Sequence, residues 1–307
     1  MEFTSHGNSQ VRDTINFEIA GRVFTLKQHR HIIIGNLQEV VGQFCDTSEL
    51  MIKNVKEDEI AELELDIHRL CWLLSFACLS EVVFYGYDYP ANQSTGHRWA
   101  ANGKLDFFRP TLQIRDGKVV KSFIEQTFNN YKSLENTRKL YAAIHYMLLI
   151  ETNDLPLEAK LALSFVLLEN LKSTYAESKD IPYINGRFRK ERTKESKPYG
   201  FKELLEMMLK EIGMTNDLSV VTKTRNKIIH SGLTQLPYDK AQKLHDDIHD
   251  LNREYILRLL GYRGEYLTYS SASNTTSSIL RILFIVAIIN KEKTGQLHTS
   301  WQPAWGG

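Results

Sequence analysis

The chain has 307 residues, of which 42% are hydrophobic and 24% are charged, and its formal net charge is +1 at pH 7. This composition is typical of a folded globular protein, and the length is sufficient for two domains that each bury a core. A nearly neutral chain has no global basic field, so any nucleic-acid-binding site must be a local patch.

The cysteines and the apolar runs indicate the cellular compartment in which the protein is expected. Three cysteines, Cys45, Cys71 and Cys78, are too few for a disulfide framework, which is typical of a reducing cytosol. The N-terminus lacks the basic-then-apolar layout of a signal peptide. The apolar run Ile279–Ile289 is interrupted by Arg281 and is shorter than the roughly 18–20 residues that span a bilayer. We therefore expect a cytoplasmic protein with no membrane partner.

Residues 1–118 mix strand and helix patterns. Short β-branched and aromatic runs separated by turn residues predict strands, and a long apolar-periodic segment predicts a helix. We expect an α+β domain here, of unknown role. The predicted elements are strands at Ile15–Ile19, Val23–Leu26, His31–Ile34 and Leu105–Ile114, a helix at Glu57–Glu81 and a loop at Pro90–Gly103.

Residues 119–268 show almost no strand pattern and predict an antiparallel bundle of four or five helices. Pro156 lies near the first turn of the strongest helix, a position that proline favours. Residues 269–307 predict a Ser/Thr/Asn-rich linker and an apolar tail docked on the body. The predicted helices are Phe123–Asn130, Thr137–Glu151, Leu157–Glu177, Phe201–Ile212, Asn216–Ser231 and Tyr238–Leu260, with a polar interruption at Ser178–Pro198.

One predicted helix ends with an arginine, an asparagine and a histidine close together. Residues 225–230 read Arg-Asn-Lys-Ile-Ile-His and are followed by Ser-Gly. Spacing alone is not diagnostic, because short motifs recur by chance and other arginines of this chain also precede a histidine. On a helix, however, Asn226 and His230 lie one turn apart on the polar side, while Arg225 projects among apolar residues such as Val221.

A guanidinium in that position must be paired or must face a cleft, because an unpaired charge in apolar surroundings costs several kcal/mol or more. We expect Arg225 to line a groove or a subunit interface. The alternative is a structural helix in which Arg225 is paired, for example with Glu169, and His230 only caps the helix end. Gly232 is a plausible left-handed stop for that helix.

This trio suits cleavage of RNA by its own 2′-hydroxyl. An imidazole titrates near neutral pH, so His230 can act as general base or acid. Arg225 can hold the scissile phosphate through two hydrogen bonds and stabilise the charge that grows on its oxygens. Asn226 can orient the imidazole or bind a phosphate oxygen. Such chemistry requires no metal and no cofactor.

The Arg-x4-His motif from Arg225 to His230, with Asn226 second and Gly232 just after, resembles the signature of HEPN domains. The order of predicted helices over about residues 120–268 is similar as well. The resemblance implies a bundle that forms a homodimer with one composite RNase site, in which Arg225 and His230 are catalytic and Asn226 is supporting. It also implies a role in bacterial toxin–antitoxin or antiviral defence systems.

Many HEPN domains are not nucleases, which keeps a second interpretation open. In that interpretation the chain is a non-catalytic module that binds RNA, a nucleotide or a protein partner in the same groove. A third interpretation is a toxin whose N-terminal domain binds an antitoxin or another regulatory partner.

A basic segment interrupts the predicted bundle and is a candidate RNA-binding loop. Positively charged side chains can follow an RNA backbone, and Phe188 can stack on a base. A solvated loop without a ligand is the alternative. The candidate RNA-binding residues are Arg187, Phe188, Arg189, Lys190 and Arg192.

His245 and His249 have the one-turn spacing of metal ligands, with several aspartates near them. Leu244, Ile248 and Leu251 define the core side of that helix, so we expect both histidines on its solvated side and no metal. No phosphate-loop, dinucleotide or nucleophile-elbow motif is present.

Overall fold

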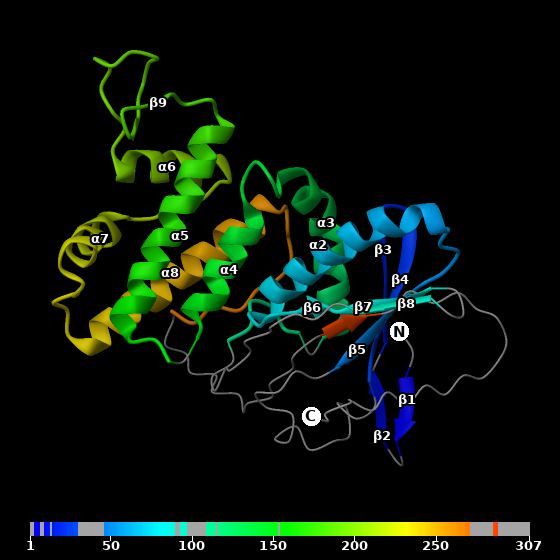
Figure 1. The fold of residues 1–307 in the computed structure, drawn as a ribbon. Coiled ribbons are helices and arrows are strands. Elements are labelled where there is room, and N and C mark those ends of the chain that lie inside the picture. The colour runs from blue at the N-terminus through cyan, green and yellow to red at the C-terminus, as the bar shows by residue number, and fades with distance from the viewer. Residues whose placement is uncertain are drawn as a thin grey trace, which may run out of the picture.

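The computed structural model describes residues 3–6, 9–12, 14–29, 46–89, 93–96, 109–114, 116–152, 154–270 and 285–287. Most of its strands gather at one end of the molecule, and its helices extend away from them to a short strand pair at the other end (Figure 1). This arrangement confirms the predicted mixture of a strand-containing N-terminal half and a helical C-terminal half.

The main sheet has five strands in the order β3-β4-β5-β11-β6. The first three pair antiparallel, and β11 pairs parallel to both β5 and β6. Phe17 and Phe24 face each other across β3 and β4, with stacked rings 5.6 Å apart, and both are buried under the helices. The bounds are β3 (Thr14–Ile19), β4 (Arg22–Gln28), β5 (Ser48–Ile52), β6 (Val83–Phe84) and β11 (Ile285–Ala287).

Helices α2 and α3 connect the sheet to the rest of the molecule. One 3₁₀ turn, η2 (Glu57–Glu59), leads into α2 (Ile60–Cys78), which ends where Leu79 takes a left-handed conformation with φ 45°. Its free cysteines, Cys71 and Cys78, are buried as expected. Helix α3 (Gly117–Leu134) packs against both α2 and β3, so one hydrophobic core continues from the sheet into the helices.

The helical half is arranged around α5. This helix (Leu157–Ser178) packs against α4 (Leu140–Ile150), α6 (Phe201–Glu211), α7 (Ser219–Ser231) and α8 (Tyr238–Leu259). Its apolar stripe is fully buried, which explains its central position. Figure 1 shows α7 and α6 on the outer side of α5 and α8, at the far end from the sheet. The four predicted helices from residue 157 onward are therefore confirmed, with ends shifted by up to three residues.

Three local predictions are wrong. Residues 109–114 form no strand, because the N–H groups of Thr111 and Leu112 both donate to the carbonyl of Ala77 at the end of α2, at 3.0 and 3.2 Å. Strand β8 (Gln93–Gly96) pairs with β7 (Gly86–Tyr89) inside the predicted loop. A hairpin of β9 (Tyr183–Ile184) and β10 (Arg187–Phe188) lies within the predicted polar interruption.

The remaining predictions concern the two ends of the chain. A further antiparallel pair, β1 (Phe3–His6) and β2 (Ser9–Arg12), precedes the sheet. Strand β11 comes from the apolar run near the C-terminus, so part of that run does dock on the body. The predicted strand His31–Ile34 and most of the predicted linker and tail lie outside the described residues. None of the described helices is both long and apolar enough to cross a membrane.

Candidate functional site

The predicted catalytic arginine is held by three contacts at the junction of α5, α6 and α7. Its Nη2 atom donates to Oε1 of Glu169 on α5 at 2.5 Å, and its Nη1 atom donates to Oδ1 of Asn226 at 2.9 Å. The guanidinium carbon of Arg225 lies 4.8 Å from the centre of the Phe201 ring, a favourable distance for a cation over a π face. The side chain is still 25% exposed. The pairing with Glu169 that the sequence suggested is therefore present, and part of the guanidinium is accessible.

The other two motif residues face solvent. Helix α7 buries Val221, Thr224 and Ile228, and this places Asn226 and His230 on its exposed side, as expected from helical spacing. His230 lies in the last turn, and the helix stops at Gly232 with φ 69°, the left-handed conformation predicted for it.

Glu169 binds a second cation besides Arg225. Its other carboxylate oxygen accepts a hydrogen bond from Nζ of Lys172, one turn further along α5. The Lys172 ammonium also lies 5.4 Å from the ring centre of Phe201 and 6.0 Å from that of Phe188. Two cations share one carboxylate, so this cluster carries a net positive charge. We call Phe188, Lys172, Phe201 and Arg225 the cation–aromatic column, because rings and cations alternate along it.

The cation–aromatic column joins the motif helix to the basic hairpin. Phe188, at one end of the column, belongs to β10 of the hairpin, and Phe201 is the first residue of α6. Arg225, at the other end, belongs to α7, so the column connects the hairpin to α7. Figure 1 shows α6 between the hairpin and α7. Two segments that the sequence singled out separately therefore lie on one side of the molecule.

The five candidate RNA-binding residues divide into two groups. Phe188 is buried against α5 and α6, so the prediction that it stacks on a base is wrong. Arg189 donates to the carbonyl oxygens of Ile184 and Ser196, and Lys190 pairs with Glu203 at 2.7 Å, so both hold the hairpin in shape. The other two, Arg187 and Arg192, are exposed and have no ion pair with any described residue.

Several apolar side chains on α7 and on the segment that follows it are exposed. Ile229 is 49% exposed, although its neighbour Ile228 is buried. Val220, Leu233 and Tyr238 are also exposed around the same helix.

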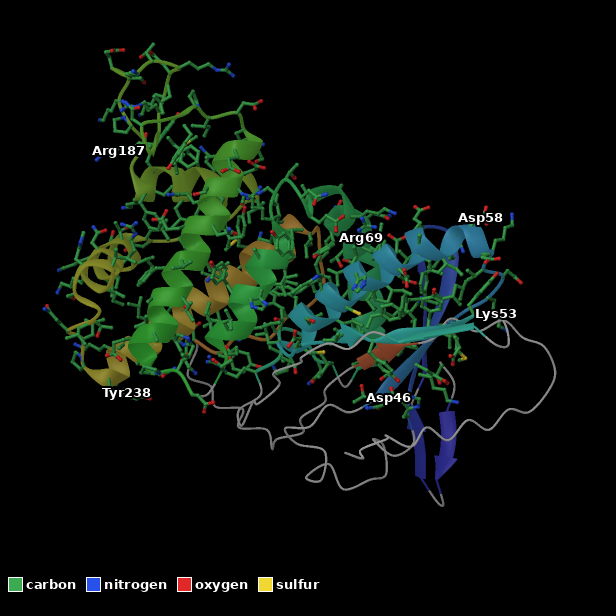
Figure 2. The ribbon with its side chains drawn as sticks, viewed as in Figure 1. Asp46, Lys53, Asp58, Arg69, Arg187 and Tyr238 are labelled. Carbon is green, nitrogen blue, oxygen red and sulfur yellow. The ribbon has the colours of Figure 1, made fainter. Side chains whose placement is uncertain are left out.

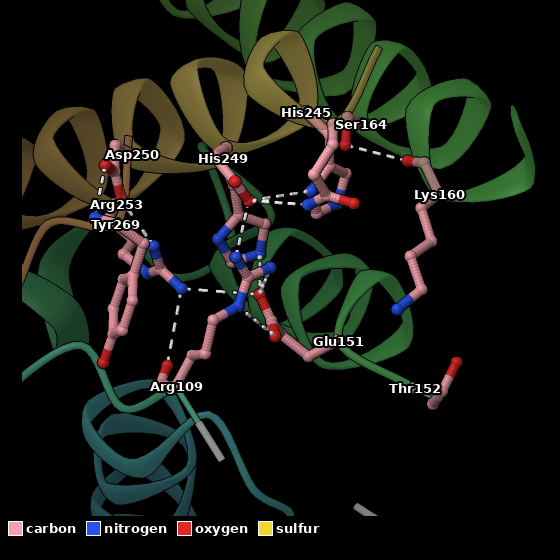
Figure 3. Close-up of polar contacts among 12 residues, drawn as sticks. Arg109, Glu151, Thr152, Lys160, Ser164, His245, His249, Asp250, Arg253 and Tyr269 are labelled. Carbon is pink, nitrogen blue, oxygen red and sulfur yellow. Dashed lines mark hydrogen bonds and ion pairs between the residues drawn. The ribbon is translucent and has the colours of Figure 1, made fainter. Parts of the chain in front are cut away.

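A second polar cluster lies inside the helical half and was not predicted (Figure 3). Glu151 at the end of α4 accepts hydrogen bonds from Nε and Nη2 of Arg109 at 3.0 and 2.9 Å, and its Oε1 atom lies 3.4 Å from Nη2 of Arg253 on α8. Arg109 also binds Asp246 at 2.6 Å, and Arg253 binds Asp250 at the same distance. No periodic pattern in the sequence indicates these contacts, because their partners come from segments up to 144 residues apart.

The two histidines of α8 belong to this buried cluster, so the prediction that they are solvated is wrong. His245 and His249 are at most 1% exposed, and Nε2 of His249 lies 3.1 Å from Oε1 of Glu151. Burial, together with the charges of Arg253 and Arg109, holds the pKa of His249 well below its usual value, so this imidazole is neutral. Helix α8 is buried on more than one side, and its pattern of apolar residues indicates only one of these sides.

The buried cluster connects parts of the fold and does not form an open site. Its carboxylates are matched by arginines, and Asp250 also accepts hydrogen bonds from the backbone N–H groups of Tyr269 and Ser270 at 2.7 Å each. Among the described residues, no group of three or more His, Cys, Asp or Glu side chains is arranged to hold a metal ion. The cluster therefore ties the segment at Arg109, α4, α8 and the chain after α8 together.

Comparison with known proteins adds no further constraint, since no family model, no curated protein and no solved structure matches this chain.

Proposed function

We propose that this protein is a metal-independent endoribonuclease whose site is built from Arg225, Asn226 and His230 of two copies of the chain. One observation carries the proposal. Glu169 and Phe201 fix the guanidinium of Arg225 at a partly exposed position, and Asn226 and His230 lie on the solvent side of the same helix. A fixed cation and an accessible imidazole are what the cleavage of a phosphodiester by a neighbouring hydroxyl requires.

The chemical step balances without a cofactor. An imidazole takes the proton of the RNA 2′-hydroxyl, whose oxygen attacks the adjacent phosphorus while the bond to the 5′-oxygen breaks. The guanidinium of Arg225 stabilises the charge on the phosphate oxygens, and a second, protonated imidazole gives its proton to the leaving 5′-oxygen. The products are a 2′,3′-cyclic phosphate and a 5′-hydroxyl.

Two copies are proposed because of the helix geometry. Arg225 and His230 are five positions apart, which separates them by roughly 140° around an α-helix, so one chain does not aim both at the same phosphate. Two imidazoles are also needed, one as base and one as acid. A symmetric pair of α7 helices supplies both, and the exposed Ile229 and Leu233 provide apolar surface for such a contact.

The test uses the purified chain with single-stranded RNA in excess EDTA. Arg225→Ala and His230→Ala are each expected to lower the cleavage rate about 10²–10⁴-fold, the usual contribution of such groups. Lys227→Ala is the matched control, because Lys227 is exposed on the same helix and should change the rate by less than threefold, about 0.6 kcal/mol. Unchanged cleavage in both motif variants would overturn the assignment.

A second candidate is a module that binds RNA or another partner at this surface without cutting. It is favoured by the ion pair between Arg225 and Glu169, because a carboxylate on the guanidinium competes with a phosphate. RNA binding by a wild-type chain that never cleaves would support it. In either case we propose a cytoplasmic protein that acts in toxin or antiviral defence, as the HEPN resemblance implies, with the N-terminal half as the place for an antitoxin or regulatory partner.

A further inference from the structure

The β9–β10 hairpin presents a tyrosine whose outer ring face is open. Tyr183 is 63% exposed, and its ring centre lies 4.8 Å from that of Phe188, the residue directly opposite it in the ladder. Residues that face each other across a ladder lie on the same face, so the buried Phe188 supports the inner side of the exposed ring. The tyrosine is thus held in position while one side of it remains free.

The hairpin itself is fixed to the body. Asn185 and Gly186 form its two-residue turn with φ 53° and 74°, the combination that matches the twist of tight hairpins. Arg189 binds the carbonyl oxygens of Ile184 and Ser196, and the Lys172 ammonium lies over the ring of Phe188. A ring on a fixed support loses little conformational freedom when a ligand stacks on it.

Exposed arginine and lysine side chains lie on the same hairpin and on the segment that follows it. Arg187 pairs through its backbone with Ile184, on the rung next to Tyr183, and Figure 2 shows Arg187 at the outer end of the molecule. Arg187, Arg192 and Lys194 are exposed and form no ion pair with another described residue. A segment that carries both a supported aromatic ring and exposed cations can bind a polyanion with accessible bases.

We infer that Tyr183 is the residue on which a base of the RNA substrate stacks, and that the substrate is single-stranded at this position. In a duplex both faces of each base are already stacked within the helix, so an exposed ring has no base face to bind. The inference rests on the proposed function, because it takes RNA as the ligand. It replaces Phe188 with Tyr183 as the stacking residue, while Arg187, Arg192 and Lys194 bind the backbone.

Binding is measured separately from cleavage, by fluorescence anisotropy with the full-length His230→Ala variant. The probes are a labelled single-stranded oligonucleotide and the same strand annealed to its complement. Adding Tyr183→Ala is expected to weaken binding of the single strand about tenfold, since one stacked base contributes roughly 1–3 kcal/mol. Tyr183→Phe keeps the ring and should bind within twofold of the parent. Tyr141→Ala removes another exposed tyrosine, on α4, and should also leave binding within twofold.

The outcomes separate this inference from the proposed function. Unchanged binding in Tyr183→Ala, or an equal loss for single strand and duplex, would overturn the inference even if the wild-type chain cleaves RNA. The expected tenfold loss in a protein that never cleaves would support the inference and refute the ribonuclease. Absence of RNA binding altogether would overturn both.

Discussion

Glu169 on α5 binds Arg225 on α7 while it also binds Lys172 on its own helix. This relationship fixes the direction of the motif arginine and at the same time occupies part of its guanidinium. A phosphate at the site must therefore share or displace a carboxylate. Because Lys172 remains as a partner for Glu169, the release of Arg225 does not leave that carboxylate unpaired.

Removing the charge of Glu169 should strengthen RNA binding. In Glu169→Gln the guanidinium is free to neutralise one more phosphate, so we expect about three- to tenfold tighter binding, equivalent to about 0.6–1.4 kcal/mol. The slope of log Kd against log salt should steepen by about 0.7 for single-stranded RNA. Both values come from anisotropy titrations over a range of salt concentrations.

The matched control for this prediction is Glu206→Gln. Glu206 pairs with Lys202 on the exposed side of α6 and does not contact Arg225. For Glu206→Gln, the slope of log Kd against log salt should stay at the wild-type value. If Glu169→Gln binds RNA with wild-type affinity and slope, Glu169 is not competing with the phosphate.

A charge in the apolar surface next to the motif should separate the two copies. Ile229→Glu places a carboxylate at an exposed apolar position one turn beyond Arg225. In a symmetric dimer the two introduced carboxylates would face each other, and their repulsion would destabilise the contact. We expect sedimentation to show a dimer for the wild type and a monomer for this variant, with cleavage lowered at least tenfold. Val23→Glu, at another exposed apolar position, on β4, should remain dimeric. A dimeric and fully active Ile229→Glu protein would contradict the composite site.

The buried cluster should contribute strongly to stability. Glu151→Gln leaves Arg109 and Arg253 without their shared carboxylate, and breaking a buried ion pair on one side costs about 3–5 kcal/mol. Urea unfolding measures the loss. Glu254→Gln breaks an exposed pair with Arg258 and should cost less than about 1 kcal/mol. Equal losses in the two variants would show that the cluster is not a structural junction.

His249 should make the fold sensitive to acid. Its pKa in the folded chain is well below the usual 6.5, so below about pH 6.5 the unfolded chain binds a proton that the folded chain does not. Above that pH the residue is neutral in both states and contributes nothing. As the pH falls below that value, stability is lost, by on the order of 1 kcal/mol at pH 5.5. The groups that face it are the charges of Arg109, Arg253 and Glu151, the ring of His245 and the carbonyl of Met147.

The measurement is the unfolding free energy at several pH values between 5.5 and 7.5. His249→Gln should reduce the loss of stability between pH 7.5 and 5.5 by on the order of 1 kcal/mol relative to the wild type, whatever its absolute stability. His145→Gln, an exposed histidine on α4, should keep the wild-type dependence. A His249→Gln protein with the same pH dependence as the wild type would show that another group is responsible.

Helical periodicity predicted α5, α6, α7 and α8 well, because each has an apolar stripe that packs on a neighbour. The same reasoning failed for His245 and His249, since a stripe identifies the most apolar side and not every buried side. A polar side chain can be buried when its partner comes from a distant segment. For His249 that partner is Glu151, which lies about a hundred residues earlier in the chain.

The hairpin could have been found from its turn. Asn185-Gly186 is a strong signal for a two-residue hairpin, and Tyr183 and Phe188 flank it symmetrically. That pairing would have placed both rings on one face. Which ring is buried could not be predicted, because it depends on Ala176 and Leu204 from two other helices. The exposed stacking candidate therefore emerged only with the tertiary structure.

In the proposed mechanism the 2′-hydroxyl of the RNA is the nucleophile at the Arg225–His230 site. After the cleaved bond of an all-ribose oligonucleotide has been mapped in EDTA, the same strand is made with one 2′-deoxy nucleotide on the 5′ side of that bond. We predict that this bond is no longer cut, and that the all-ribose product ends in a 2′,3′-cyclic phosphate. Cleavage of the 2′-deoxy strand at the original bond and rate would contradict the mechanism.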